Sequence, residues 1–506
     1  MRTTTDRETR PESRPKAESS QHSADALAVF EARPSVASKP SWLWMIGLTL
    51  GAAALRLPTL GHWSLSGDEI YSHYDALGVD LDDWGSTPWG VRHYPLVYVL
   101  IRLAYEVFGQ SELAARLFPA LFGIAAVPAI YWALSRFTRQ AVARWAALLI
   151  LLSPWHLFNS QNARFYSAVF FFGGAGMLLV FSALERNRAR NLWAGLICLG
   201  LATLSHPSGG LAMGAVVVYV LLIALLPGFE RPPGLNRRIL LPPGILLGVV
   251  AVLASPKAYD LIMMRKSSQL REAVYDTTHL ISALIFNIGP HLCLMALVGA
   301  VVLLWRRNRL GLFLVSIAAI PIVSLILLSF KFSTGHRYAF SVAPAVFILA
   351  AVGIAAVVKL VRTRSLACAV AVASIFLLYP SSSLLSYYQD GDRHDFRGAA
   401  EQVAASFEVG DVILAESHGY VEHYAPGLYA LELPMPWERM QELARRNRRV
   451  WCIVKAGRSG VLQDPHGATE SWVNLHGCLV ARISAPRYDY HLNELRIYLC
   501  EIPENG

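Results

Sequence analysis

Apolar segments about as long as a bilayer is thick recur along this chain of 506 residues. A helix needs about 20 consecutive apolar residues to cross the hydrocarbon core, so such segments predict membrane-spanning helices. The composition agrees, because 54% of the residues are hydrophobic and only 16% are charged, against about 25% charged in soluble domains. We therefore expect a polytopic α-helical membrane protein, with apolar runs at 42–60, 113–134, 141–158, 165–184, 192–205, 209–227, 238–255, 281–304, 310–330, 339–360 and 365–380.

Short clusters of arginine and lysine separate alternate pairs of these runs. The positive-inside rule places such clusters in cytoplasmic loops, which puts the acidic loop 61–93 on the outer side. The net charge is +9, and the basic residues lie in these short clusters between the apolar runs. Because they form no single stripe, we expect no nucleic-acid partner. The segment 94–109 is short and contains Arg102 and Glu106, so we expect about 11 to 13 spans. The expected location is the plasma (inner) membrane.

The two ends of the chain differ from this apolar middle. Residues 1–41 are rich in Ser, Pro, Arg and Glu, which predicts a disordered cytoplasmic tail before a transmembrane domain at 42–385. Between 386 and 506, segments with helical periodicity alternate with strand-like runs. This pattern predicts a small extracytoplasmic α/β domain on the same side as the loop 61–93. The six cysteines show no CxxC spacing and predict no zinc site, although three lie in this domain, where an oxidising compartment would permit one disulfide.

Polar residues gather in the segments that we expect to face outward. Each has a plainer interpretation, such as a solvated acid, a helix break or an arginine that snorkels to the interface. Cations on the side that the positive-inside rule disfavours nevertheless suit an anion, and the guanidinium fork of arginine matches phosphate. The residues are Asp68, Glu69, His93, Arg164, Tyr166, His206, His336, Arg337 and Tyr338.

The adjacent acids of "SGDEIY" need not share one task, because neighbouring residues on a helix point about 100° apart. Asp68 or Glu69 could act as a base while the other binds a cation or orients a neighbour. Together with His93, which could also carry a proton, the two acids could form a partial site for a divalent metal ion. The chain has no P-loop and no GxSxG motif, which disfavours a nucleotide-driven pump and a serine hydrolase.

Several motifs resemble polytopic glycosyltransferases of the C-type fold. They are the "GDE" after the first run, "HYPLVYVLIRLAYEVFGQSELAARLFPALFG", "SPWHLFNSQNARFYS", "LSHPSGG" and "RYAFSVAPAVFILAAVG". The resemblance covers about residues 42–380 and is strongest to the bacterial branch related to protein O-mannosyltransferases and lipid A aminoarabinose transferases. The usual "HPPL" of the family is "HYPL" here, with Tyr94 in place of the first proline.

The resemblance implies a donor sugar joined to a polyprenyl phosphate and an acceptor hydroxyl on a lipid, glycan or protein. Transfer would occur on the extracytoplasmic side of the lipid membrane, with inversion at the anomeric carbon. By its match to the catalytic acid position of the family, Asp68 is the predicted general base, with Glu69 beside it. The predicted ligands of the donor phosphate are Arg337 first, then His336, Arg164 and His206, and the predicted donor or acceptor contacts are His93, Tyr166 and Tyr338.

Two other classes of protein fit parts of the pattern. A ligase or polymerase of lipid-linked glycans shares the substrate class, but usually relies on arginines in a large outer loop. A flippase or transporter would place ionisable residues in the middle of its spans or use discontinuous helices. Here the conspicuous polar groups lie at the ends of the apolar runs, which favours chemistry at the membrane surface.

Overall fold

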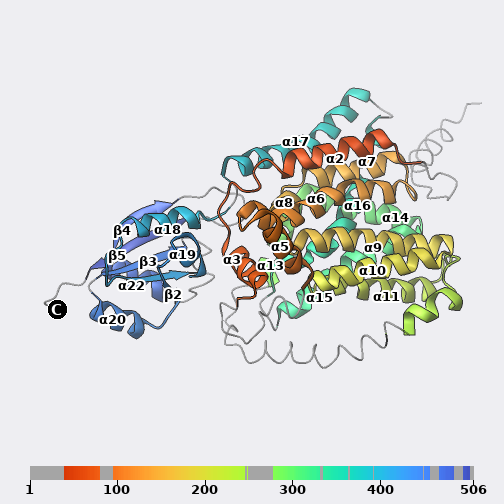
Figure 1. Cartoon of the computed structure of the whole chain (residues 1–506). Coiled ribbons are helices and arrows are strands. Elements are labelled where there is room, and N and C mark those ends of the chain that lie inside the picture. Colours follow the sequence, from red (N-terminus) through yellow and green to blue (C-terminus); the bar gives the residue numbers. More distant parts are fainter. Residues whose placement is uncertain are drawn as a thin grey trace, which may run out of the picture.

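The structure is a computed structural model that describes residues 39–79, 95–245, 248, 277–330, 334–362, 365–390, 393–416, 418–447, 449–455, 467–483 and 494–501. A bundle of helices makes up most of it, and a small domain with a sheet lies at the C-terminal end (Figure 1). The helical elements of the bundle are α2 (Trp42–Arg56), α3 (Gly67–Leu77), α5 (Pro95–Phe108), α6 (Glu112–Leu134), α7 (Gln140–Leu152), α8 (Pro154–Ser160), α9 (Tyr166–Arg186), α10 (Ala189–Ser205), α11 (Gly209–Leu225), α13 (Thr277–Ile288), α14 (Pro290–Trp305), α15 (Arg309–Ser329), η3 (His336–Val342), α16 (Ala343–Arg362) and α17 (Leu366–Asp390).

Four of the described helical segments are long and apolar enough to cross a membrane, namely α6, α9, α15 and the continuous stretch His336–Arg362. Two bent pairs, α7 with α8 and α13 with α14, would each add one span. Each bend falls at a proline that begins the second helix, Pro154 or Pro290, where the missing N–H costs no helical bond. The expectation of membrane-spanning helices is thus confirmed. The number of spans stays a prediction, and the predicted tail lies almost wholly outside the described residues.

Glycines allow the helices of the bundle to approach closely. A β-carbon at Gly176 of α9 would lie 3.0 Å from the carbonyl oxygen of Gly195 of α10, and the reverse distance would be 2.9 Å. A β-carbon at Gly299 of α14 would lie 3.1 Å from the backbone nitrogen of Gly353 of α16, and the reverse distance would be 3.2 Å. Small residues at helix contacts are the usual means of tight packing in membranes, because burial from water is not available there as a driving force.

We expect Gly353→Ala to destabilise the bundle. Its new methyl group would lie 2.0 Å from the carbonyl oxygen of Met295, so α14 and α16 would have to separate. Overpacking of this kind costs about 1–3 kcal/mol, which thermal unfolding in detergent would detect as a lower midpoint. Gly200→Ala in α10 is the matched control, because nothing lies within 4 Å of its new methyl group. Equal midpoints for the two variants would contradict this account of the packing.

The C-terminal domain is a five-stranded mixed sheet with helices, as the strand-like runs of the sequence predicted. The strand order is β2-β1-β3-β5-β4, in which β1 is parallel to β2 and β3 while β5 is antiparallel to β3 and β4. All six cysteines are described and are free thiols in the structure. The elements are α18 (Phe396–Ala404), β1 (Val412–Glu416), α19 (Gly419–Tyr424), β2 (Ala430–Leu433), α20 (Trp437–Arg446), β3 (Arg449–Lys455), α22 (Ala468–His476), β4 (Cys478–Ile483) and β5 (Leu495–Glu501).

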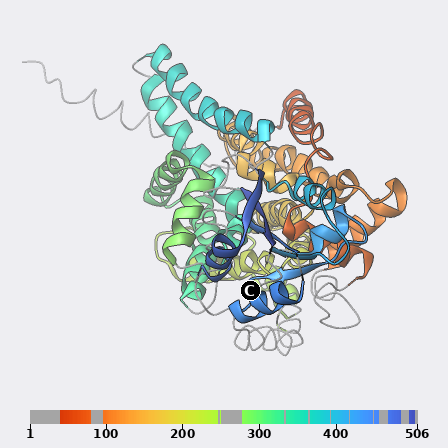
Figure 2. The same ribbon diagram turned by 90° about the vertical axis from the view of Figure 1, so that its left-hand side faces the viewer.

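This domain is docked on the end of the bundle where α3 lies (Figures 1 and 2). The backbone N–H of Leu65 donates to the hydroxyl of Tyr424 at 2.5 Å, and the hydroxyl of Ser64 donates to the carbonyl of His394 at 3.1 Å. Arg397 of α18 forms an ion pair with Glu112 at the start of α6. The domain therefore holds the short segment that leads into α3, which carries the adjacent acids. The boundary at 385/386 stays a prediction, since α17 continues to Asp390.

Candidate active site

Asp68 and Glu69 lie in the first turn of α3. Ser66 is the N-cap residue, and the carboxylate of Glu69 accepts a hydrogen bond from the backbone N–H of Ser66 at 2.9 Å. A serine followed three residues later by glutamate is the sequence signature of a capping box. The segment "SGDE" therefore begins a helix, so Asp68 and Glu69 point in different directions from the same turn.

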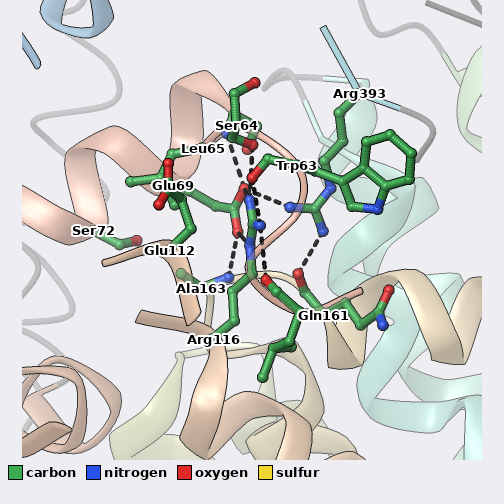
Figure 3. A network of polar contacts seen from close by, with 12 residues as sticks. Trp63, Ser64, Leu65, Glu69, Ser72, Glu112, Arg116, Gln161, Ala163 and Arg393 are labelled. Atoms are coloured by element: carbon green, nitrogen blue, oxygen red, sulfur yellow. Dashed lines mark hydrogen bonds and ion pairs between the residues drawn. The ribbon is translucent and has the colours of Figure 1, made fainter. Parts of the chain in front are cut away.

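Glu69 points inward and is fully buried. One of its carboxylate oxygens accepts from Arg116 Nε at 2.8 Å and from the backbone N–H of Ala163 at 2.7 Å. The other oxygen accepts from Arg116 Nη2 and from Arg393 Nη1, both at 2.9 Å (Figure 3). Both arginine side chains are also buried. The carboxylate of Glu69 is thus at the centre of a network that joins α3, α6, the segment before α9 and the segment after α17.

Arg116 extends this network into the chain that precedes α3. Its Nη1 donates to the carbonyls of Leu60 and Trp63 at 3.1 and 2.8 Å, and its Nη2 donates to the carbonyl of Ser64 at 2.8 Å (Figure 3). All of the donor atoms of this guanidinium are therefore used. A buried guanidinium is costly unless its donors are satisfied, and here the same contacts fix the position of the segment that leads into α3.

The charge state of Glu69 follows from these partners. Desolvation by burial raises the pKa of Glu69, but the charges of Arg116 and Arg393 and the hydrogen bonds outweigh it and lower the pKa to about 2. Glu69 is therefore ionised at neutral pH.

We expect this shift to make the stability of the protein sensitive to acid. The pKa of Glu69 is lower in the folded state than its ordinary value of 4.5, so the unfolded chain binds the proton first as the pH falls. The stability that Glu69 contributes is complete above that ordinary value and is lost as the pH approaches about 2. Unfolding midpoints measured in detergent over this range would show the loss. A Glu69→Gln variant with the same pH dependence as the wild type would exclude Glu69 as its source.

Asp68 points the other way and remains accessible, with 42% of its side chain exposed. Its carboxylate forms an ion pair with Arg337 of η3. Arg164 binds the same turn of α3, since its Nη1 donates to the backbone carbonyl of Asp68 and to the hydroxyl of Ser72, each at 3.0 Å. Desolvation raises the pKa of Asp68, but the charges of Arg337 and Arg164 outweigh it and lower the pKa to about 2.

Aromatic rings connect the segments around Phe165, His206 and Tyr338. The ring of His206 stacks between Phe165 and Tyr338, with centroid distances of 4.0 and 5.2 Å and interplanar angles of 10° and 8°. The Nδ1 atom of His206 accepts from the backbone N–H of Ser208 at 3.1 Å. Segments that are far apart in the sequence therefore meet beside Asp68.

The structure places most of the predicted site residues at this location. Asp68, Arg164 and Arg337 are in direct contact, while His206 and Tyr338 form the adjacent stack. Tyr166 begins α9 and is buried next to this group, with its ring 4.5 Å from that of Phe165. His336 begins η3 beside Arg337. His93 lies outside the described residues.

The two described residues of the suggested metal site, Asp68 and Glu69, both pair with arginines, and the site stays a prediction because His93 lies outside the described residues. Both oxygens of Glu69 accept hydrogen bonds from arginine, which repels a divalent cation. Asp68 has Arg337 as its neighbour. In the part of the chain that the structure describes, no three His, Cys, Asp or Glu side chains lie close enough together to hold a metal ion.

Three cations near the acids were not predicted. Arg116 is an arginine within an apolar helix, which is a signal in the sequence, and Arg393 is hidden among the polar residues of "QDGDRHDF". Lys455 lies at the end of β3 in the C-terminal domain, and its charge helps to lower the pKa of Asp68. Burial lowers the pKa of Lys455 itself, against the opposing effect of Glu416 and Asp68. The C-terminal domain thus adds positive potential to the site.

Comparison with known sequences gives a match to a family model and a match to a relative. Residues 86–230 match the family model of dolichyl-phosphate-mannose-protein mannosyltransferase. A protein of Aquifex aeolicus (strain VF5) is 29% identical over 134 residues, which is 26% of this chain and 27% of that protein. The match therefore spans about a quarter of the length of this relative.

Solved structures match over most of the chain. The apo structure of ArnT from Cupriavidus metallidurans has a TM-score of 0.55 at 16% identity, covering 90% of this chain and 97% of ArnT. The structure of ArnT from the same organism bound to undecaprenyl phosphate has a TM-score of 0.52 at 16% identity. This match covers 90% of this chain and 98% of ArnT. A third match is the oligosaccharyltransferase AglB from Archaeoglobus fulgidus, in complex with an inhibitory peptide and a dolichol-phosphate. Its TM-score is 0.53 at 14% identity, and the match covers 90% of this chain and 75% of AglB. The chain therefore has the C-type glycosyltransferase fold that its motifs predicted.

Proposed function

We propose that the protein is an integral-membrane glycosyltransferase that moves a sugar from a polyprenyl-phosphate donor to an acceptor hydroxyl on the extracytoplasmic face. The observation that carries the proposal is an accessible, ionised Asp68 beside Arg337 and Arg164, at the end of a bundle of membrane helices. The fold supports it, because ArnT binds undecaprenyl phosphate and AglB a dolichol-phosphate. The match of 86–230 to the mannosyltransferase model points to the same substrate class.

In this proposal Asp68 is the general base. The acceptor oxygen attacks the anomeric carbon and loses its proton to Asp68, while the bond from that carbon to the phosphate oxygen breaks. Attack from the face opposite the leaving phosphate inverts the anomeric configuration. The electron pair of the broken bond leaves with the polyprenyl phosphate, where positive side chains stabilise the developing charge.

The donor phosphate would bind to the cations that now surround Asp68. Arg337 and Arg164 come first, because guanidinium groups bind phosphate through two parallel hydrogen bonds. His206 and His336 lie next to them, and Tyr166 and Tyr338 border the same place. A phosphate that draws Arg337 away would also raise the pKa of Asp68 toward its ordinary value, which makes the carboxylate a stronger base when the donor is bound. Substrate binding would thus prepare the base.

Glu69 has a different role in this proposal. Both of its oxygens are occupied within the buried network, so it positions the first turn of α3 and does not take the proton. Glu69 therefore acts through Asp68.

The proposed phosphate site is tested by measuring the binding of polyprenyl phosphate to an Arg337→Gln variant. We expect it to weaken binding of polyprenyl phosphate to the purified protein by about tenfold or more, because a hydrogen bond to a charged group contributes about 1.5–3 kcal/mol. Retention of the lipid can be measured by native mass spectrometry in detergent. The control is Arg102→Gln on α5, whose side chain is 60% exposed and pairs with the exposed Glu106. Equal affinities for both variants would remove Arg337 from the phosphate site.

A further inference from the structure

A second basic site lies away from Asp68. It is a cavity of about 480 Å³ lined by the ends of α6, α9, α14 and α15 and by the chain after α11. Its lining includes five arginines against two glutamates, together with Phe137, Phe181, Gly228, Asn308 and Leu310. The charged residues are Arg136, Arg186, Arg306, Arg307, Arg309, Glu185 and Glu230.

The helices place this cavity at the opposite face of the membrane from Asp68. α9 begins at Tyr166, beside the candidate active site, and ends at Arg186, in the lining of the cavity. Its 21 residues cover about 30 Å, which is the thickness of the hydrocarbon core. Trp305, at the end of α14, is 86% exposed next to the cavity. Tryptophan is typical of the membrane–water interface, so the cavity lies at the level of the lipid headgroups.

The carboxylates of the cavity are both directed at one arginine. Arg309 contacts Glu185 at 2.8 Å and Glu230 at 3.7 Å. Arg136 lies over the ring of Trp132 at 3.5 Å, and Arg186 donates to the backbone carbonyl of Arg136 at 3.2 Å. These contacts gather positive groups around one partly enclosed space.

The positive charges around Arg136 also favour an anion in this cavity. Burial and the charges of Arg186 and Arg188 lower the pKa of Arg136. The arginines therefore repel each other, and an anion between them would relieve that repulsion.

The backbone also favours an anion at this place. Asn308 caps α15, accepting from the backbone N–H groups of Leu310 and Gly311 at 2.9 and 3.3 Å. Asn308 and Leu310 both line the cavity, so the positive end of the α15 dipole faces it. Gly228 has φ +92°, and a β-carbon there would collide with the guanidinium of Arg307. The glycine thus leaves the space that Arg307 needs to reach the cavity.

We propose that this cavity binds the phosphate headgroup of an anionic phospholipid from the leaflet opposite Asp68. Basic pockets between transmembrane helices are suited to such headgroups, and the cavity is large enough for one. The exposed apolar surface beside it, including Leu225 and Trp305, would lie against the acyl chains. This site is separate from the proposed donor site and does not depend on the transferase activity.

The proposal is tested by lipid binding to the purified full chain. We expect native mass spectrometry to show phosphatidylglycerol retained more strongly than phosphatidylcholine. Arg136→Gln/Arg307→Gln should weaken that retention by about tenfold. The matched control is Arg237→Gln/Arg238→Gln, which removes the same charge from exposed arginines that do not line the cavity. Equal loss in both variants, or no preference for the anionic lipid, would overturn the proposal.

Two further arms make the result decisive. Glycerol phosphate at millimolar concentration should not displace the lipid, and displacement would show a site for soluble anions instead. A photoreactive phosphatidylglycerol, used with the wild-type protein, should label the segments around Arg136, Arg186 and Arg307. Labelling elsewhere would overturn the proposal even if the double variant failed to fold.

Discussion

Asp68→Asn is expected to lower the rate of sugar transfer by about 10²- to 10⁴-fold, which is the contribution of a positioned general base. Asparagine has nearly the same shape but cannot accept the proton of the acceptor hydroxyl. The side chain of Asp68 is 42% exposed and is held by Arg337, so the substitution removes one ion pair and leaves the buried network intact. The folded protein should therefore persist with its chemistry lost.

The control for this variant lies on the same helix. Asp75 is on α3, about two turns after Asp68, and is partly exposed. Asp75→Asn changes the charge by the same amount and should leave the rate within about twofold, since it removes no proton acceptor from the reacting atoms. Unfolding midpoints of both variants should match that of the wild type. Equal rates for Asp68→Asn and the wild type would remove Asp68 from the chemistry and make Glu69 the next acid to test.

Glu69→Ala is expected to give the largest loss of stability. It leaves the guanidinium groups of Arg116 and Arg393 buried without their carboxylate, and breaking a buried ion pair in this way costs about 3–5 kcal/mol. Because Arg393 follows α17 and Arg116 lies in α6, the C-terminal domain should loosen from the bundle as well. Thermal unfolding and limited proteolysis of the purified protein would show both effects.

A surface ion pair provides the comparison for Glu69. Arg102 and Glu106 lie on α5 at 3.9 Å with side chains 60% and 70% exposed, and such pairs contribute about 0–1 kcal/mol. Glu106→Ala should therefore leave the midpoint nearly unchanged. If Glu69→Ala were as mild as Glu106→Ala, the buried network would not be what fixes α3.

The features that the sequence predicted correctly depend on local pattern. Apolar runs predicted membrane-spanning helices, and strand-like runs predicted β1, β3, β4 and β5, because each of these signals depends only on residues that are close together in the sequence. The meeting of Asp68, Arg164 and Arg337 follows from the expected topology, since each lies at an end of an apolar run that we expect to face outward.

The role of Glu69 could not be predicted in this way. Its partners Arg116 and Arg393 are 47 and 324 residues away along the chain, and neither contact has a local pattern. The capping signature "SGDE" was visible and would have shown that Asp68 and Glu69 share one helical turn. It does not show which acid faces inward. Lys455 was beyond prediction for a similar reason, because its position depends on how the C-terminal domain docks onto α3.

The central claim is that this protein transfers sugar from a polyprenyl phosphate. The most direct test is to incubate the purified wild-type protein, in lipid, with a panel of radiolabelled polyprenyl-phosphate sugars and to measure both products. We predict that one donor of the panel is consumed, with one polyprenyl phosphate released for each sugar transferred to an acceptor or to water. A folded protein that retains polyprenyl phosphate but turns over no donor of a broad panel, or that uses a nucleotide sugar instead, would contradict the claim.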